Sequence, residues 1–216
     1  MKLNDLDTII KGRYSVRSWR EEDVPEDLLL QAIELAAWAP NGGNQQNWRF
    51  YLIMNKDTIG AIADAVQAKA DKMASWPGAD KFLGMNRVTG RAGFFRSAPA
   101  AIAVTASLYQ SPVDKLLEAN EGKNPEAGVI RQWRNIADSR IQSVSAAITT
   151  LLLVLHQMGV GSLWMTGPMQ AKKDIEKILN VPDEFDVVAF IPVGYAADIP
   201  GDRTRKPLSE VCEVVR

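Results

Sequence analysis

RYSVR at residues Arg13–Arg17, followed at residues Ala39–Trp48 by APNGGNQQNW, is the part of this sequence that most constrains its fold. The first stretch places two cations and a hydroxyl within five residues, just before an expected helix. The second follows that helix directly and joins side-chain amides to glycines before an expected strand. The two stretches therefore flank one helix, and a fold that brings them together gathers cations and amides at one site.

Cations and amides of this kind suit a ligand with two chemically different ends. Guanidinium groups pair with phosphate oxygens through forked hydrogen bonds. Side-chain amides both donate and accept hydrogen bonds, which suits a planar heterocycle with carbonyl groups and ring nitrogens. The two stretches therefore predict a site for a nucleotide-like cofactor such as FMN.

The bulk composition predicts one domain over residues 1–216. The chain has 216 residues, of which 46% are hydrophobic, enough for a single buried core. Its net charge of −1 gives no global positive field for nucleic acid or an acidic membrane surface, so phosphate recognition has to be local. The single cysteine, Cys212, excludes an intramolecular disulfide and fits a reducing compartment. With no signal-peptide run in its opening residues, we expect a cytoplasmic protein.

A long stretch without charge predicts a buried central helix. No Asp, Glu, Lys or Arg lies between Arg140 and Lys172, which raises the possibility of a membrane span. Residues 141–158 are too polar and too few for one, because a spanning helix needs about 20 mostly apolar residues. We therefore expect a helix from about Gln132 to Met158, buried on nearly all sides by its own fold or by a partner subunit.

The remaining pattern alternates helices with strands. Two polar or irregular excursions, near 75–97 and 109–130, interrupt it, and the first is expected to form a mobile lid. Trp76, Phe94, Phe95 and Trp133 lie in or beside these excursions, where either packing or the wall of a substrate pocket would explain them. The order fits an α+β layered domain. Helices are expected at 5–11, 25–39, 56–72 and 174–179, and strands at 50–54, 99–106, 161–165 and 187–193.

Four segments in this order resemble the FMN-dependent nitroreductase family. They are RYSVR, PNGGNQ, the stretch GVGSLWMTG at Gly159–Gly167, and Val193–Tyr195 leading to RTRKPL at Arg203–Leu208. The resemblance spans nearly the whole chain. It implies an α+β fold with a mixed central sheet flanked by helices, a long buried central helix, and a homodimer joined through helices and swapped termini.

The resemblance assigns the cations to the two ends of FMN. Arg13 would bind the phosphate together with Arg203 and Arg205, and Ser15 would reach the ribityl–phosphate region. Arg17 would lie near flavin N1 and O2, where a cation supports the negative charge of reduced flavin. Solvated arginines beside a helix are the other explanation of such a pair. Tyr14, also in this stretch, stands where a basic residue is common, which removes one possible phosphate partner.

The amide loop is assigned to the neighbouring subunit. In the family this loop packs along the flavin across the dimer interface, which carries over to Pro40, Asn41, Gly42 and Asn44. Ordinary turn chemistry would also explain the same residues. Two departures bear on the shape of the loop, since the family usually has Ser in place of Asn41 and Pro in place of Asn47.

A third segment would pass the reactive edge of the flavin. In the family a backbone N–H from the stretch that matches Met165, Thr166 and Gly167 hydrogen-bonds flavin N5. Thr166 stands where some branches carry an acid, which makes this site more neutral. Gly167 lets the backbone come close to a ring.

The resemblance implies an NAD(P)H-dependent oxidoreductase without a metal and without a proton-shuttling side chain. Because the chain has no Gly-x-Gly-x-x-Gly stretch, NAD(P)H would dock only transiently, over the flavin. After it leaves, a flat electron-poor acceptor such as a nitroaromatic or quinone would bind in the same place, which gives ping-pong kinetics. Reductive dehalogenation, ene reduction and flavin breakdown are alternatives on the same fold. A non-catalytic FMN storage or sensor protein, and a helical interaction module without cofactor, are alternatives outside it. His156, the only histidine, is expected to be a satisfied core residue.

Overall fold

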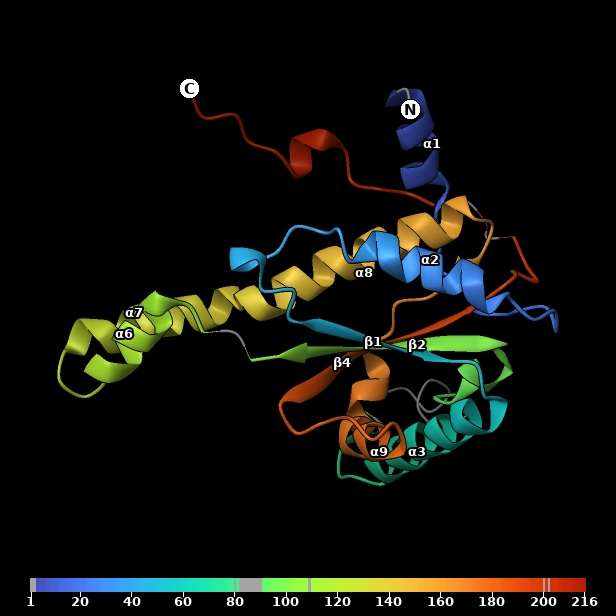
Figure 1. The fold of residues 1–216 in the computed structure, drawn as a ribbon, viewed down its shortest axis with the longest axis horizontal. Helices are drawn as coiled ribbons and strands as arrows, with labels where there is room; N and C mark the ends of the chain where they lie inside the picture. The colour runs from blue at the N-terminus through green and yellow to red at the C-terminus, as the bar shows by residue number, and fades with distance from the viewer. Residues whose placement is uncertain (1–2, 80, 82–90, 109, 200, 202) are drawn as a thin grey trace.

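A four-stranded sheet separates two layers of helices in the computed structural model, which describes residues 3–79, 81, 91–108, 110–199, 201 and 203–216 (Figure 1). The strands are β1 (Trp48–Ile53), β2 (Ala100–Ser107), β3 (Gly161–Ser162) and β4 (Phe185–Gly194). The helices are α1 (Leu3–Gly12), α2 (Glu26–Ala36), α3 (Lys56–Ala74), α6 (Pro112–Asn120), α7 (Pro125–Ala137), α8 (Ser139–Gln157) and α9 (Lys172–Ile178). The α+β architecture expected from the sequence is confirmed.

The sheet has the strand order β1-β2-β4-β3, and each neighbouring pair is antiparallel. The resemblance implied a mixed sheet. Among the described residues, the parallel pairing is a single bridge between Ser15 and Ser162 of β3. β2 lies in the middle and is buried from Ala100 to Ala106, because helices cover both of its faces. The bridge matters for function, because it fixes the RYSVR stretch to one edge of the sheet.

Two cores form on the two faces of the sheet. α2 and α8 cover one face, and α3 and α9 cover the other (Figure 1). Side chains alternate between the faces along β2, so Ile102 joins the α2–α8 core while Ala101 and Ala103 join the α3–α9 core. Phe95, from the first predicted excursion, is fully buried in the α3–α9 core. Its role is therefore packing.

The central helix is shorter than predicted. The expected helix from Gln132 to Met158 is interrupted at Asp138, whose left-handed φ of 35° ends α7 at Ala137 and begins α8 at Ser139. The Asp138 carboxylate accepts a hydrogen bond from the backbone N–H of Ile141, which caps the new helix. Because apolar residues recur at helical spacing on both sides of Asp138, the sequence pattern did not reveal that two helices meet there.

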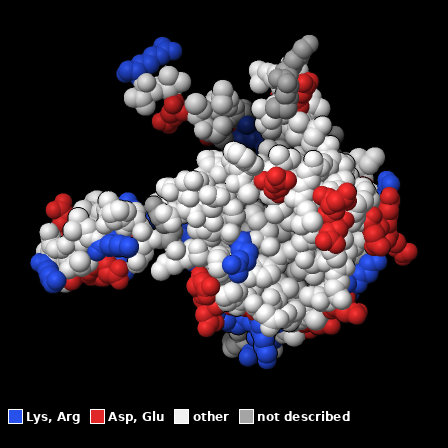
Figure 2. Space-filling model, viewed as in Figure 1, with Lys and Arg blue, Asp and Glu red and all other residues white. Residues whose placement is uncertain are grey.

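Only one side of α8 is buried within a single chain. Val144, Ile148, Leu151 and Leu155 pack into the core, whereas Thr149 on the opposite side is exposed. The face over α2 and α8 carries few charged side chains (Figure 2). We expected α8 to be buried on nearly all sides, but within one chain only one of its sides is buried.

The second excursion is a pair of helices rather than an irregular segment. α6 and α7 pack on each other and project away from the sheet (Figure 1). Pro112 and Pro125, which suggested breaks, stand in the first turns of these helices, where a proline leaves no hydrogen bond unmade. The side chains of Ser111 and Asn124 cap the two N-termini. The expectation that Pro112 and Pro125 break this stretch is wrong for this physical reason.

The first excursion lies partly outside the described residues. Its described end includes a short 3₁₀ helix at Phe94–Ser97, and Phe94 stacks on Trp19 with ring centroids 6.3 Å apart. Of the predicted lid at 75–97, residues 80 and 82–90 lie outside the described part of the chain. Among the described residues, no helix combines the length and the apolar character that crossing a bilayer requires.

Candidate functional site

The RYSVR stretch is fixed between the end of α1 and the edge of the sheet. α1 ends at Gly12, and the backbone N–H of Arg13 still bonds the carbonyl of Ile9 at 3.0 Å. The N–H of Val16 then donates to the carbonyl of Ser162 in β3 at 3.1 Å, and the Val16 side chain is buried. Alternate side chains of the stretch, at Ser15 and Arg17, stay available at the surface.

The chain that follows β4 holds the same stretch from its other side. The N–H of Arg20 donates to the carbonyl of Tyr195 at 2.9 Å, and the N–H of Ala197 donates to the carbonyl of Ser18 at 3.1 Å. The Ser18 hydroxyl also donates to the carboxylate of Asp198. These contacts explain how residues almost 200 positions apart in sequence reach one site.

Three arginines meet where the C-terminal tail passes this stretch. Arg203 donates to the carbonyls of Lys11 at 2.8 Å, Gly12 at 3.2 Å and Arg13. Arg13, Arg203 and Arg205 line one pocket of about 360 Å³, together with Tyr14, Ser15, Arg17 and Gly201. The sequence therefore predicted correctly which arginines come together.

Among the described residues, no carboxylate pairs with this cluster of positive charges. Within the described part of the chain, none of Arg13, Arg203 and Arg205 forms an ion pair. Burial and the positive charges of Arg203 and Arg205 lower the pKa of Arg13. Like charges held this close repel one another, so an anion bound among them would relieve the repulsion. The pocket has the electrostatics of a phosphate site.

Tyr14 and Arg17 occupy different parts of this site. The Arg203 guanidinium lies 5.7 Å from the centre of the Tyr14 ring, a cation–π contact that helps to orient it. Arg17 is exposed and donates to the carbonyl of Ser15 at 3.3 Å. Arg17 also lines a neighbouring pocket of about 240 Å³ with Asp198 and Ile199. Its guanidinium is thus exposed beside the pocket that the three arginines line.

The segment at Met165–Gly167 begins at the same edge of the sheet. Met165 exchanges two backbone hydrogen bonds of 3.0 Å with Phe190, after which the chain leaves the sheet. Thr166 and Gly167 are exposed, and a Cβ added to Gly167 would meet no atom within 4 Å. Ser162, which pairs with Ser15, lies only four residues before Thr166, about 13 Å of extended chain. One elongated ligand can therefore reach both segments.

The amide loop lies elsewhere in the chain. Its turn is held by Asn41, which accepts a 2.9 Å hydrogen bond from the N–H of Gln46, and the N–H of Gly42 donates to the Ser143 hydroxyl of α8 at 3.2 Å. Asn44 has a left-handed φ of 52°. Pro40, Gly42 and Asn44 are exposed.

α8 separates this loop from the arginines. Ser143, under the loop, and His156, beside Arg13, stand 13 residues apart on the helix, which is about 20 Å. The loop and α1 accordingly lie toward opposite ends of α8 (Figure 1). A single chain therefore places Arg13, Ser15, Arg17, Arg203 and Arg205 around one pocket, with Met165–Gly167 following at the same edge of the sheet. It leaves Pro40, Asn41, Gly42 and Asn44 apart from them.

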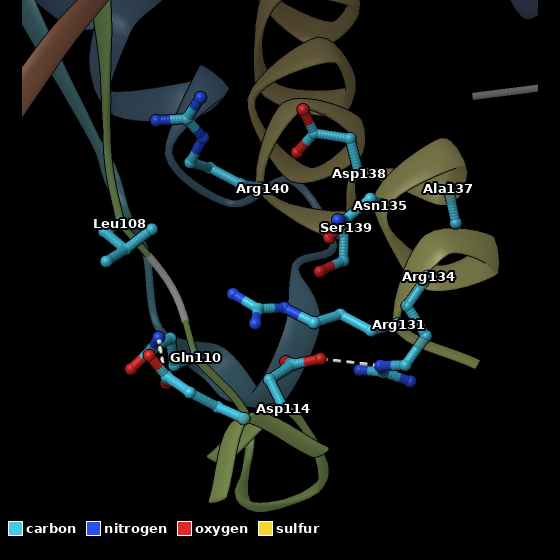
Figure 3. Close-up of a pocket in the computed structure, with 11 residues that line it drawn as sticks. Leu108, Gln110, Asp114, Arg131, Arg134, Asn135, Ala137, Asp138, Ser139 and Arg140 are labelled. Carbon is cyan, nitrogen blue, oxygen red and sulfur yellow. Dashed lines mark hydrogen bonds and ion pairs between the residues drawn. The ribbon is translucent and has the colours of Figure 1, made fainter. Parts of the chain in front are cut away.

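A second pocket, which the sequence did not reveal, lies between the helical hairpin and the start of α8. It has a volume of about 400 Å³, and its Arg134 pairs with Asp114 at 2.6 Å (Figure 3). Arg140, which also lines it, pairs with Asp186 at 2.7 Å. The hydrogen bond from Arg134 is the main cause that lowers the pKa of Asp114. These pairs come from separate elements without a local motif, so no sequence signal pointed to them. Their charge balance distinguishes this pocket from the arginine cluster.

A pair of glycine substitutions tests the packing of the RYSVR stretch. A Cβ at Gly161 would lie 2.6 Å from Val16 Cγ2 and 3.0 Å from the Gly194 carbonyl oxygen. Gly161→Ala is therefore expected to cost about 1–3 kcal/mol of folding free energy, which a thermal melt measures. Gly167→Ala is the matched control and should leave the melting temperature unchanged, because its surroundings are open. Equal melting temperatures for the two variants would contradict this packing.

Comparison with known proteins agrees with the fold. The nitroreductase family model matches residues 10–195. A protein of Methanothermobacter thermautotrophicus called putative NADH dehydrogenase/NAD(P)H nitroreductase is 24% identical, over 94% of this chain and 84% of its own. The structure of a BluB-like flavoprotein from Clostridium difficile 630 covers both chains completely, with 28% identity and a TM-score of 0.84.

A structure of oxidised iodotyrosine deiodinase bound to FMN and 3-iodo-L-tyrosine is also similar. It is 25% identical, with a TM-score of 0.70, and the match covers 98% of this chain and 97% of that one. These matches extend across both helical layers and the sheet. The chain belongs to the nitroreductase family.

Proposed function

We propose that this protein is an FMN-dependent oxidoreductase that transfers hydride from NAD(P)H, through flavin N5, to a flat electron-poor acceptor such as a nitroaromatic or a quinone. The observation that carries the proposal is the cluster of Arg13, Arg203 and Arg205, whose charge no described carboxylate offsets. Family membership and the FMN bound to the deiodinase neighbour support the choice of flavin. When bound, FMN supplies the acceptance and donation of hydride.

The arginine cluster would hold the phosphate. Arg13, Arg203 and Arg205 approach the pocket from two separate parts of the chain, which suits an anion with several oxygens. A charge-assisted hydrogen bond contributes about 1.5–3 kcal/mol, so three such donors can retain the cofactor without a covalent link. Ser15, which lines the same pocket, would serve the neighbouring part of the ligand.

The residues nearer to Met165–Gly167 would serve the flavin ring. Arg17 is exposed and can place its positive charge against N1 and O2, where it would stabilise the negative charge of reduced flavin. The open space at Gly167 admits a ring close to the backbone, and the backbone N–H groups of this segment are candidates to hydrogen-bond N5. In this proposal the chain acts by position and charge rather than by shuttling a proton.

The complete site requires a second copy of the chain. The amide loop lies about 20 Å along α8 from the arginines, so the loop that covers a given flavin would come from the partner. Trp38 on the α2 side is 84% exposed, and four apolar residues of the extended C-terminal tail are exposed as well. A homodimer would bury these surfaces, with a flavin at each end of the interface. The tail residues are Leu208, Val211, Val214 and Val215.

Reductive dehalogenation is the second candidate, favoured by the similarity to the iodotyrosine deiodinase structure. Steady-state kinetics with NADH and NADPH against a nitroarene, a quinone and 3-iodo-L-tyrosine separates the two. We expect turnover of the nitroarene and quinone, with the parallel reciprocal plots of a ping-pong reaction. Turnover of the iodotyrosine alone would favour the second candidate. Bound FMN with no turnover of any acceptor would favour a storage or sensor role.

A further inference from the structure

His156 lies in a pocket that shares Arg13 and Tyr14 with the arginine pocket, rather than in a closed core. It stands in the last turn of α8, where the sequence suggested a satisfied core residue. The side chain is half-buried, and neither ring nitrogen has a hydrogen bond to any described residue. It lines a pocket of about 230 Å³ with Arg13 and Tyr14, next to the turn that leads into β3. The imidazole has no hydrogen-bond partner among the described residues and lies in a pocket, so it is available to a ligand.

The imidazole packs against the residues that Arg203 holds. A Cβ added to Gly12 would lie 2.8 Å from His156 Nε2, so the ring occupies the space that a side chain at position 12 would fill. The ring also meets the Tyr14 ring edge to face, with centroids 6.4 Å apart. Tyr14 and Gly12 also contact the Arg203 guanidinium. His156 therefore supports the position of Arg203 through two contacts.

Among the described residues, the two charged groups that act on His156 are both cations. Arg13 approaches from the stretch after α1, and Arg203 approaches from the tail. α8 itself has no Asp, Glu, Lys or Arg beyond Arg140, and on α1 the exposed Lys11 pairs with Asp7. Burial, followed by the charges of Arg13 and Arg203, lowers the pKa of His156. An anion placed between these arginines would oppose their effect on the imidazole.

We propose that His156 is a positioning residue of the phosphate site, which packs Gly12 and Tyr14 against Arg203 and takes up a proton when the phosphate of FMN binds beside it. This inference rests on the proposed function, because it takes FMN as the ligand of the arginine cluster. It adds a group that the family resemblance did not assign. It also predicts that flavin affinity is linked to pH through one side chain.

Because His156 is the only histidine, NMR can follow its titration without assignment. The titration is recorded for the flavin-free protein, with saturating FMN, and with saturating riboflavin, which has the same ring but no phosphate. FMN is expected to raise the titration midpoint by about 1 pH unit, since an opposite charge within a few ångströms favours the protonated ring. Riboflavin is expected to leave the midpoint unchanged.

Two variants separate positioning from protonation. His156→Phe keeps an aromatic ring against Gly12 and Tyr14 but cannot ionise. In the wild type, FMN affinity should rise by up to about tenfold as the pH falls through the histidine midpoint. The His156→Phe variant should still bind FMN, but with an affinity that does not change over this pH range. His156→Ala removes the packing as well and should weaken FMN binding about threefold to tenfold at every pH.

The outcomes distinguish this inference from the function on which it rests. Quenching of flavin fluorescence reports FMN binding independently of the histidine. Failure of FMN to bind would overturn the proposed function and this inference with it. FMN binding without a change in the histidine midpoint, or an equal change with riboflavin, would overturn the inference alone. An upward shift with FMN only, together with the flat pH profile of His156→Phe, would support it.

Discussion

The double substitution Arg203→Ala with Arg205→Ala is expected to weaken FMN binding by about 10²–10⁴-fold. Each arginine is expected to contribute a charge-assisted hydrogen bond to the phosphate, and such a bond is worth about 1.5–3 kcal/mol. Removing the pair leaves Arg13 as the remaining cation of the cluster. Titration of the flavin-free protein with FMN, followed by fluorescence quenching, measures the loss.

Arg203 has a second role that the experiment has to separate. It caps the end of α1 through the carbonyls of Lys11 and Gly12, so its loss also loosens the local structure. Arg205 makes only a local hydrogen bond, to the carbonyl of Thr204 at 2.8 Å, among the described residues. Arg205→Ala alone should therefore weaken FMN binding without changing the melting temperature of the flavin-free protein.

The matched control is Lys206→Ala, one residue further along the exposed tail. Lys206 lies outside the arginine pocket and pairs with Glu210 at 3.7 Å. Its loss should leave FMN affinity within about twofold of the wild type, because an exposed ion pair contributes little. Full flavin occupancy in the Arg203 and Arg205 double variant would refute the phosphate assignment.

A heterodimer of two defective subunits is expected to recover one flavin site. One subunit carries Arg203→Ala with Arg205→Ala, and the other carries Asn41→Ala with Asn44→Ala in the amide loop. If the loop of each subunit covers the flavin of its partner, each homodimer has two damaged sites. The heterodimer concentrates both defects in one site and leaves the other intact.

Co-expression with two affinity tags isolates the heterodimer. We expect about one FMN per heterodimer, and little flavin in either variant homodimer. The anchor of the loop on α8, from the Gly42 N–H to the Ser143 hydroxyl, is unchanged in these variants, so the subunits should still fold. A heterodimer without flavin, or a loop-variant homodimer with full flavin, would contradict a site shared between subunits.

The sequence predicted the elements whose signals are local. Acidic residues and a proline at 23–27 indicated the start of α2, and an apolar run indicated β2. Pro112 and Pro125 misled because a proline is compatible with the first turn of a helix as well as with a break. The break at Asp138 was not predicted, because this one residue caps both α7 and α8 and the apolar pattern runs through it without interruption.

The sequence indicated which arginines line one pocket, but not how the other candidate segments lie relative to it. The arginines at 13, 203 and 205 could be chosen by motif, and backbone pairing of Ser18 with Ala197 explains why they meet. No sequence signal placed the amide loop at the far end of α8, because that distance depends on how the two helical layers pack. His156 was misjudged since its apolar neighbours along the helix suggested a core, while its ring packs against Gly12 at the end of α1 and against Tyr14.

The most direct test of the central claim is the visible spectrum of the purified protein, recorded anaerobically before and after addition of NADH or NADPH. We predict a yellow protein whose released chromophore is FMN and whose absorbance bleaches rapidly with one of the two donors. A colourless protein that also fails to take up added FMN would contradict the account.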